Sequence, residues 1–452
     1  MNSDGHTTFT TASRLPSCSK MQLHLENTMR LLKNSSPLRS FGLSLICGLI
    51  LSSLLHRSLW AGDVPPSPRP QLEIEHWMDI EWTLGTDLPR GFQDSDGGIL
   101  GSELITVGGF CSGGLEEDNR RKPGKYPRGF MKTGWSLDLS RPNSNWINLP
   151  DFPGDARQGL FAAKVGNSLY FWGGFSYSAP YCYQDGYSLS RASDGQWSWS
   201  RLPDLPWKTS SAGICCIGPK IYMCGGADYD GETGFFTEHT RDKQVPRLGA
   251  RLLVCDTEHL DQGWKELTAC PGTPRFVMAF QPVGGKLYLI GGATGDVVKE
   301  GQRYGYCTVV DNWSYDPATD QWSRLRDLPV SSGNFPKSSN LVFMDRYLIL
   351  PGGHQYTYIV NPDGTIRSSY GKAGRKRPES GLHNDVFVYD TLTNQFGRGD
   401  SLPIDNNLPM SVVQGNKLYL IGGETGGGEI HGQYYGHHPD LLLIGTLKLS
   451  RP

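Results

Sequence analysis

Short runs of apolar residues, separated by polar turns, recur along most of this chain, and six of these runs end in the same way. Each finishes in two adjacent glycines, at intervals of 52 to 70 residues. Apolar runs of this length that end at turn residues predict β-strands, and a recurrence of this period is typical of a repeat architecture. The six pairs are Gly108-Gly109, Gly173-Gly174, Gly225-Gly226, Gly291-Gly292, Gly352-Gly353 and Gly422-Gly423.

A second pattern follows each of the first five pairs. After a polar stretch of variable length come an aromatic or aliphatic strand, a turn rich in Asp, Asn and Gly, and a strand that closes on Leu-Pro or a similar pair. Short alternating strands with such turns predict four-stranded antiparallel blades. We expect the aromatic residue of each closing strand to pack within its blade; these residues are Trp146, Trp199, Trp264, Trp322 and Phe396.

The sixth closing strand is missing after the last glycine pair, where the chain continues to Pro452. A matching segment lies near the N-terminus, where residues 80–84 (IEWTL) run into Asp87-Leu88-Pro89. We therefore predict that an N-terminal strand completes the last blade, which hides edge strands that would otherwise pair with other chains. The predicted fold is all-β, a six-bladed propeller that spans residues 79–452.

This combination of glycine pairs, aromatic strands and tryptophans resembles the kelch family in all six copies. The resemblance implies a kelch-type β-propeller. Enzymes and protein-binding adaptors share that fold, so the fold alone does not decide the function.

The N-terminal region differs from the rest. Residues 41–55 form an apolar run that follows basic residues and precedes Ala61, a pattern typical of a secretory signal and short for a membrane span. We predict a presequence over residues 1–61, with a signal peptide cleaved near Ala61, and a proline-rich linker over residues 62–78. The expected location is periplasmic or extracellular; the alternative is a membrane anchor formed by residues 41–55.

Composition and charge reduce the number of function classes that the chain can belong to. The net charge is −2, so nothing indicates binding to nucleic acid. An even number of cysteines, eight, follows the presequence and permits disulfides in an exported protein, but buried thiols suit the same strands. Cys111 with Cys182 is the pairing we expect. No cysteine or histidine cluster has the spacing of a zinc site, and we predict neither a metal nor a cofactor.

Long loops follow the glycine pairs. In an antiparallel meander, these loops and the loops after the Leu-Pro strands open on the same face, so one mouth of the ring collects both sets. Long loops on one face of a rigid ring are the usual place of binding and catalysis. The loops span residues 111–132, 176–186, 228–248, 294–308, 355–383 and 425–438.

Three arginines stand in the second set of loops, each at the entry to an inner strand: Arg90, Arg157 and Arg275. Guanidinium groups bind a carboxylate through two parallel hydrogen bonds. We expect the three to point into one solvent-filled funnel and to bind an anionic ligand. For each arginine taken alone, a salt bridge at the rim is the alternative.

Acidic and basic residues near the glycine pairs are candidates for proton transfer. Glu424 and His354 directly follow the sixth and fifth pairs, and the ligand-binding candidates Asp228 and Asp296 lie slightly further out. A side chain directly after a strand-ending pair is expected to point into the funnel, where Glu or His can act as general acid or base. The same side chain can instead hold a loop, and the residues alone leave both interpretations open.

Two stretches resemble a particular group of kelch proteins, the bacterial N-acetylneuraminate epimerases. They are residues 418–428 and the segment from Trp146 through Phe152-Pro-Gly-Asp-Ala-Arg157 to Gly174. Those epimerases are exported six-bladed propellers that interconvert the α and β anomers of sialic acid. The resemblance implies a mouth that binds a sugar and an isomerase of the mutarotase type.

One position departs from that family. The epimerases place a catalytic Glu directly after the glycine turn of the fourth blade, with an Arg six residues on, whereas this chain has Ala293 there. The nearest arginine is Arg303, in a longer loop. If the chain keeps the activity, Glu300 with Arg303, or Glu424, has to supply the missing groups.

The expected partner is therefore a small-molecule sugar, acidic in character, bound with or without turnover. The first alternative is a cell-envelope propeller that binds a protein through the same face, since aromatic residues are frequent in its loops. The second is a copper radical oxidase of the galactose-oxidase type. It would need Cys, Tyr and His ligands, and the adjacent His437 and His438 are poorly placed to bind one ion together.

Overall fold

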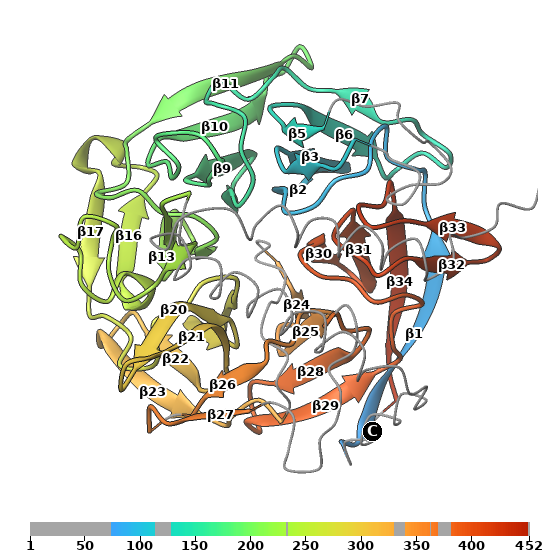
Figure 1. Ribbon diagram of the computed structural model, residues 1–452. Helices are drawn as coiled ribbons and strands as arrows, with labels where there is room; N and C mark the ends of the chain where they lie inside the picture. Colours follow the sequence, from blue (N-terminus) through green and yellow to red (C-terminus); the bar gives the residue numbers. More distant parts are fainter. Residues whose placement is uncertain are drawn as a thin grey trace, which may run out of the picture. The chain divides into compact units, whose positions relative to one another are not determined.

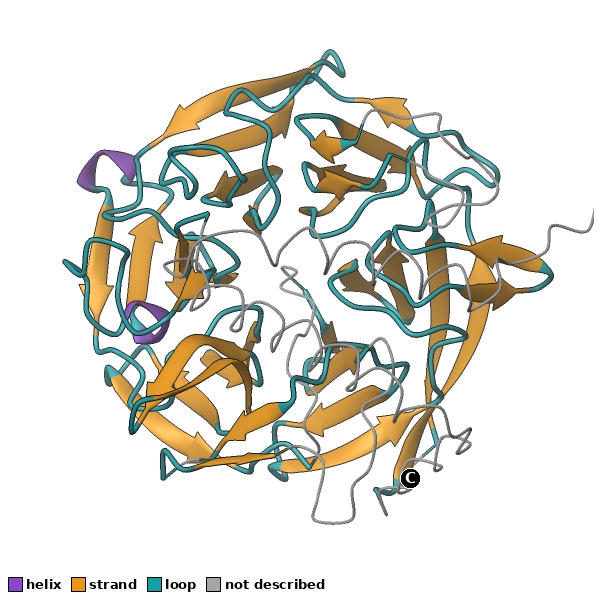
Figure 2. Cartoon of the chain, in the orientation of Figure 1, coloured by secondary structure: helices purple, strands orange, loops and turns teal. Residues whose placement is uncertain are grey.

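The computed structural model describes residues 74–113, 128–231, 234–329, 340–361, 363–368 and 381–450. Apart from two short 3-10 helices, η2 (Leu248–Ala250) and η3 (Leu260–Gln262), their regular structure is β-strand (Figure 2). The predicted signal peptide and most of the predicted linker lie outside the described residues. No helix within the described ranges is long and apolar enough to cross a membrane.

Each glycine pair belongs to a four-stranded antiparallel unit, and we number these units as blades 1 to 6. Blades 1 to 4 are separate sheets, and blades 5 and 6 form one eight-stranded sheet. Blades 1 to 3 contain β2 (Asp96–Leu100), β3 (Glu103–Val107), β6 (Gly134–Asp138) and β7 (Ile147–Asn148); β8 (Phe161–Val165), β9 (Ser168–Trp172), β10 (Gly186–Arg191) and β11 (Trp197–Leu202); and β12 (Gly213–Ile217), β13 (Lys220–Cys224), β16 (Leu252–Asp256) and β17 (Trp264–Leu267). Blades 4 to 6 contain β18 (Ala279–Val283), β19 (Lys286–Ile290), β22 (Asn312–Asp316) and β23 (Gln321–Leu325); β24 (Val342–Phe343), β25 (Tyr347–Pro351), β28 (Val386–Asp390) and β29 (Gln395–Gly399); and β30 (Met410–Gln414), β31 (Lys417–Ile421), β34 (Leu442–Leu449) and β1 (His76–Leu84).

The blades of residues 74–450 surround a central axis (Figure 1). Their innermost strands β2, β8, β12, β18, β24 and β30 contact one another in that order, and β30 contacts β2 again. Apolar side chains fill the spaces between neighbouring blades; Tyr222 of blade 3, for example, belongs to the same buried cluster as Phe280 of blade 4. The hydrophobic core is therefore divided among the interfaces between blades.

Further strand pairs lie in the loops that follow the glycine pairs. β20 and β21 form a long hairpin that continues through β26 into a four-stranded sheet, and three smaller hairpins belong to blades 1, 3 and 6. These strands are β20 (Ala293–Lys299), β21 (Gln302–Val309), β26 (Tyr358–Val360), β27 (Ile366–Ser368), β4 (Phe110–Cys111), β5 (Gly129–Phe130), β14 (Asp228–Tyr229), β15 (Phe235–Phe236), β32 (Gly428–Ile430) and β33 (Gln433–Tyr435).

The N-terminal strand closes the ring, as the sequence predicts. β1 pairs antiparallel with β34, with Trp82 opposite Gly445. The strand begins at His76, inside the predicted linker and before the predicted boundary at residue 79. It starts earlier because its first residues also pair with β29, parallel, with Met78 opposite Gly399.

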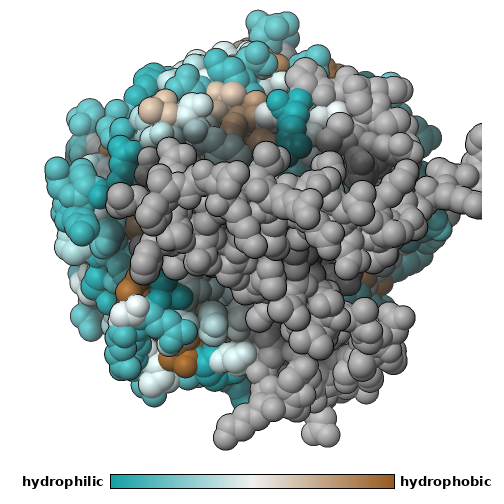
Figure 3. Space-filling model, in the orientation of Figure 1, coloured by the Kyte–Doolittle hydropathy of each residue, from teal (hydrophilic) through white to brown (hydrophobic). Residues whose placement is uncertain are grey.

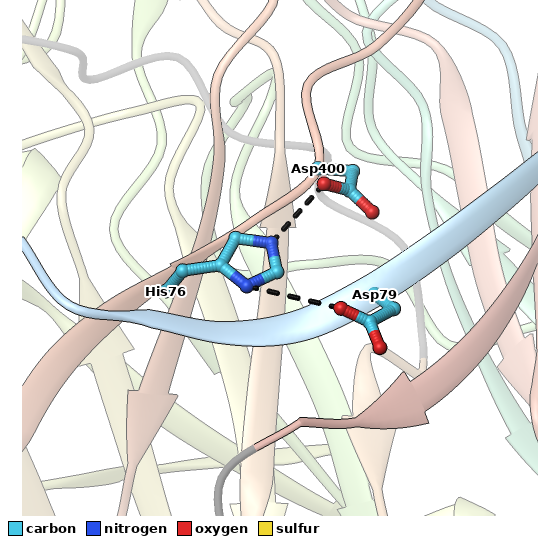
Figure 4. A group of neighbouring side chains, drawn as sticks. All are labelled: His76, Asp79 and Asp400. Atoms are coloured by element: carbon cyan, nitrogen blue, oxygen red, sulfur yellow. Dashed lines mark hydrogen bonds and ion pairs between the residues drawn. The ribbon is translucent and has the colours of Figure 1, made fainter.

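His76 adds polar contacts at this closure (Figure 4). Its Nε2 lies 3.1 Å from Oδ1 of Asp400, and its Nδ1 lies 3.8 Å from Oδ1 of Asp79 and 3.3 Å from Oγ of Ser450. The second oxygen of Asp400 accepts a hydrogen bond from the N–H of Ile80 at 2.8 Å. These contacts join the first strand to blade 5 and to the end of the last strand.

Tryptophans of the outer strands join neighbouring blades through a repeated hydrogen bond. Four indole N–H groups donate to a backbone carbonyl of the preceding blade at 2.8–3.0 Å, in the pairs Trp82 to Ser401, Trp146 to Thr86, Trp199 to Pro150 and Trp322 to Thr268. Blade 3 differs, because Trp172 donates to Pro203 instead. The ring of Trp264 packs against Trp172 with the centroids 4.9 Å apart. The outer aromatic positions are thus structural, as expected.

We predict that Trp82→Ala lowers the free energy of unfolding by about 2–4 kcal/mol, because it removes a large ring and a hydrogen bond at the closure. Trp82→Phe should cost only about 1 kcal/mol, because it loses mainly the hydrogen bond. Urea unfolding measures both. Ile147→Ala, at an outer-strand side chain that is 64% exposed, is the matched control and should change stability by less than about 0.5 kcal/mol. An unchanged midpoint for Trp82→Ala would contradict this role of the strand.

Candidate functional site

The glycine pairs join each blade to the next. In all six pairs the first glycine has φ of 62–73° and the second has φ of 98–118°, a region that favours glycine. In the five pairs whose acceptor is described, the N–H of the second glycine donates at 2.8–3.0 Å to a backbone carbonyl of the following blade. The acceptors are Phe92, Arg157, Thr209, Arg275 and Asn406.

The residue after each pair occupies one repeated position around the mouth, which we call the post-glycine position. Its occupants are Phe110, Phe175, Ala227, Ala293, His354 and Glu424, and each forms an isolated backbone bridge. The first four are buried. His354 and Glu424, in the adjacent blades 5 and 6, are partly exposed and are the titratable members of the set.

Glu424 is held from two sides. Its Oε2 accepts a hydrogen bond from Nδ2 of Asn407 at 3.0 Å, and its Oε1 lies 3.5 Å from Nε2 of His437. The glutamate side chain is 29% exposed and the histidine 43% exposed, so both reach solvent. The carboxylate and the imidazole can therefore meet a ligand while they remain in contact with each other.

His438 lies beside this pair and is buried. Its ring stacks on that of His437 with the centroids 4.5 Å apart and meets Phe110 edge-on at 5.9 Å. Burial, and then the neighbouring His437 and Arg128, lower the pKa of His438 to about 3. The ring is neutral at physiological pH, and its Nδ1 has no hydrogen-bond partner among the described residues.

Aromatic rings continue around the mouth from blade 1 to blade 5. Successive ring centroids are 4.6–6.3 Å apart, and we call the set the aromatic arc: Phe110, Phe130, Phe175, Phe235, Phe276, Tyr306, Tyr356 and His354. Hydrophobic side chains reach the surface of this face over the part of the ring labelled β5, β9 and β10 (Figures 1 and 3). The partly exposed members of the arc provide flat apolar surfaces on which a sugar can stack: Phe130, Phe235, Tyr306 and Tyr356.

Tyr177 and Arg128 complete the site on the side of blades 1 and 2. Tyr177 is 58% exposed, and its ring packs on Phe130 with the centroids 4.8 Å apart. Burial raises the pKa of Tyr177, Arg128 lowers it, and Asp94 and Glu424 raise it. Tyr177, Arg128 and Glu424 therefore lie near enough for their charges to interact. In the sequence, His437 stands out only as the neighbour of His438 and Arg128 is an isolated loop residue, so their place in the mouth is revealed by the structure.

Two of the three predicted carboxylate-binding arginines are structural, which corrects the expectation of an arginine-lined funnel. Arg157 and Arg275 are 1% and 0% exposed. In each, Nη1 donates to the carbonyl of the first glycine of its own blade, and a carboxylate lies 2.5 Å away, from Asp185 and Asp311 respectively. Both guanidinium groups thus brace the glycine turns, and neither reaches the solvent.

The third arginine is not equivalent to the other two. Arg157 and Arg275 each lie 16 residues before the first glycine that they brace, whereas the same spacing in blade 1 leads to Phe92. Arg90 is partly exposed, and its Nη1 lies 3.8 Å from the sulfur of Met131. Asn406 takes the bracing role in blade 6, where its Nδ2 donates to the carbonyl of Gly422 at 3.0 Å.

The remaining candidates are scattered. Asp228 is buried, and its carboxylate accepts the N–H groups of Tyr229 and Arg241 at 2.9 and 2.7 Å, which holds a loop. Glu300 and Arg303 are exposed at the tip of the β20–β21 hairpin, which lies across the ring from blade 6 (Figure 1). His354 stands at the far end of the aromatic arc. The side chain of Asp296 lies outside the described residues, and its role stays a prediction.

The expected disulfide is absent. Cys111 and Cys182 are both buried and form no disulfide, and none of the other described cysteines forms one. The two thiols have different partners, because Cys111 accepts the N–H of Gly113 at 3.3 Å and Cys182 contacts the carbonyl of Ala227 at 3.8 Å. Burial raises the pKa of the Cys182 thiol well above its usual value, which makes it unreactive.

Among the described residues, one group has the composition and spacing to hold a metal ion: His76, Asp79 and Asp400 at the closure. Both ring nitrogens of this histidine and one oxygen of Asp400 already have partners within the protein. The group is also exposed and belongs to the seam between the first and last strands. We interpret it as a structural contact.

We predict that Arg275→Met destabilises the fold by about 3–5 kcal/mol, because it leaves the Asp311 carboxylate buried without its partner. Burial raises the pKa of Asp311, but Arg275 and the hydrogen bonds from Trp313 and Thr273 bring it below its ordinary 3.8. The pair therefore stabilises the fold above that pH, and its contribution is lost as the pH falls through the lower folded-state value.

Urea unfolding of the wild type and the Arg275→Met variant at neutral and acidic pH measures both effects, and the difference between the two proteins should shrink in acid. Arg141→Met is the control, because its ion pair with Asp138 is at the surface, with the arginine 81% exposed, and is worth at most about 1 kcal/mol. Equal stability losses in the two variants would overturn the structural role of Arg275.

Comparison with known proteins supports the resemblance that the motifs indicate. No family model matches the chain. The N-acetylneuraminate epimerase of Pasteurella multocida (strain Pm70) is 25% identical over 371 residues, which cover 76% of this chain and 89% of the relative. The protein of the same name from Haemophilus influenzae (strain 86-028NP) is also 25% identical over 371 residues, with 76% and 88% covered.

A solved structure, that of YjhT, shares the fold with a TM-score of 0.55 at 18% identity, and the match covers 81% of this chain and 100% of that one. The fold is therefore a kelch-type β-propeller. Over about three quarters of its length, the chain is similar to proteins named N-acetylneuraminate epimerase.

Proposed function

We propose that this protein, after export from the cell, binds a carbohydrate at the mouth beside blades 6, 1 and 2 and interconverts its anomers. The observation that carries the proposal is the place of Glu424. It is the one carboxylate among the six post-glycine positions, and it contacts an imidazole. Its charge also raises the pKa of Tyr177, which packs on Phe130 of the aromatic arc. The similarity to proteins named for a sugar epimerisation supports the same class of reaction.

Ring opening of a sugar hemiacetal needs two proton transfers. A base takes the proton of the anomeric hydroxyl, an acid protonates the ring oxygen, and the bond between the anomeric carbon and the ring oxygen breaks. The open carbonyl form rotates, and the ring closes on the other face while both protons return. Glu424, held by Asn407, has the geometry of the base.

Glu424 also supplies a carboxylate in place of the glutamate that the epimerases have where this chain has Ala293. Ala293 is fully buried in an apolar cluster with Ala227, Phe276 and Val277, and its methyl side chain cannot exchange protons. Glu424 occupies the corresponding position two blades further along the chain. Because the blades repeat, a carboxylate at either position is presented to the mouth from the same backbone geometry.

An acidic sugar is the narrower proposal. The buried Arg157 and Arg275 no longer support it, and the exposed guanidinium of Arg128, whose Cζ lies 6.0 Å from the ring centroid of Phe110, takes their place. A carboxylate held by Arg128 would leave the sugar ring over Tyr177 and Phe130. N-Acetylneuraminate is therefore the first substrate to test.

We predict that the wild type speeds the approach to anomeric equilibrium of freshly dissolved N-acetylneuraminate, followed by one-dimensional NMR. Glu424→Gln should slow the catalysed rate by about 10²–10⁴-fold, the range for general acid–base catalysis. Glu429→Gln is the matched control, because this carboxylate is exposed on the neighbouring strand β32, and it should keep the wild-type rate.

Two results would contradict the proposal. One is a wild type that accelerates anomerisation of neither N-acetylneuraminate nor common hexoses; a protein captured from cell-envelope extract through the mouth would then favour the interaction propeller. The other is an active wild type whose rate Glu424→Gln leaves unchanged, which would place the acid elsewhere.

A further inference from the structure

We propose that His437 is the second proton-transfer group of the site and that it works as a pair with Glu424. The loop selects the tautomer of the His437 imidazole. This inference rests on the proposed function for its chemistry, but not for its geometry. The pair consists of Nε2 of His437 and Oε1 of Glu424, which are 3.5 Å apart.

The backbone fixes which nitrogen carries the first proton. Nδ1 of His437 lies 3.1 Å from the carbonyl oxygen of Thr425. A carbonyl can only accept a hydrogen bond, so Nδ1 must carry a proton in every state that keeps this contact. The other nitrogen, Nε2, is then the site that gains or loses a proton, and it faces the carboxylate.

Thr425 is itself held in place, which makes this orientation rigid. Its N–H donates to the carbonyl of His437 at 2.8 Å, and its hydroxyl donates to the carbonyl of Gly436 at 2.8 Å. The hydroxyl also accepts the N–H of Gly427 at 3.0 Å. The residue is fully buried, so the two ends of the blade 6 loop are tied together at the imidazole.

The histidine stacked against this pair adds no charge to it. His438, stacked against the imidazole, is neutral at physiological pH because burial lowers its pKa to about 3. It therefore places no positive charge against a protonated His437. The buried Nδ1 of His438, which has no hydrogen-bond partner among the described residues, is a second sign that the region is built for a ligand.

Proton transfer through the pair is balanced over one turnover. The carboxylate of Glu424 takes the proton of the anomeric hydroxyl, and protonated His437 gives its Nε2 proton to the ring oxygen as the C–O bond breaks. The open sugar then faces a protonated Glu424 and a neutral His437. Ring closure on the other face returns both protons, so the pair regains its starting state without any other reactant.

The first test needs no activity. In 15N NMR at a pH that leaves His437 neutral, its ring should show the pattern of a proton on Nδ1, whereas free histidine prefers Nε2. His437→Gln assigns the signal. A neutral His437 protonated on Nε2 would overturn the proposal, whether or not the protein proves to be an enzyme.

The second test measures turnover. His437→Gln should lower kcat for N-acetylneuraminate by about 10²-fold or more and leave KM within about threefold, because only the proton transfer is lost. His431→Gln, at the exposed turn between β32 and β33, is the matched control and should match the wild type. A folded His437→Gln protein with unchanged kcat, or with a loss confined to KM, would overturn the role in proton transfer. A wild type without activity would instead defeat the proposed function, and the nitrogen spectrum would still decide the tautomer.

Discussion

The hydrogen bond from the second glycine of a pair to the next blade, described at five of the six pairs, is the interaction on which the rest of this structure depends. It requires two consecutive residues at positive φ, which only a glycine pair adopts without strain. Because the acceptor belongs to the following blade, these bonds set the rotation from one blade to the next at the five junctions where the acceptor is described. They also bring the post-glycine side chains to one rim and so create the mouth.

The same constraint explains why the prediction that Arg157 and Arg275 bind a ligand was wrong. A carbonyl that accepts from the glycine must be held still, and at two blades a guanidinium performs this task by binding the next glycine turn and an aspartate. The sequence shows these arginines recurring at the entry to inner strands, but recurrence is equally typical of a ligand site and of a structural brace. The fixed spacing of 16 residues from a glycine, absent at Arg90, is the signal that separates the two.

The fold was predictable because its determinants are local. Glycine pairs, closing strands and the displaced Trp82 segment each leave a mark within a few residues, and the pairing of β1 with β34 confirms the closure. The site depends on contacts between residues far apart in the chain, such as Phe110 with His438. Glu424 could be predicted as a site residue because it adjoins a glycine pair. The role of His437 depends on its contact with Thr425, which forms only when the loop folds back. In the proposed function, the buried alanine at position 293 and the paired carboxylate at position 424 occupy one repeated position, so the chemical group changes blade while the ring stays the same.

The most direct measurement is a crystal structure of the Glu424→Gln protein soaked with N-acetylneuraminate. The account predicts a sugar in the mouth with its anomeric oxygen in hydrogen-bonding reach of position 424 and of His437 Nε2, and its ring against Tyr177 and Phe130. A sugar bound instead in the groove under the β20–β21 hairpin, beside Lys299 and Arg324, or on the outer strands, would contradict it.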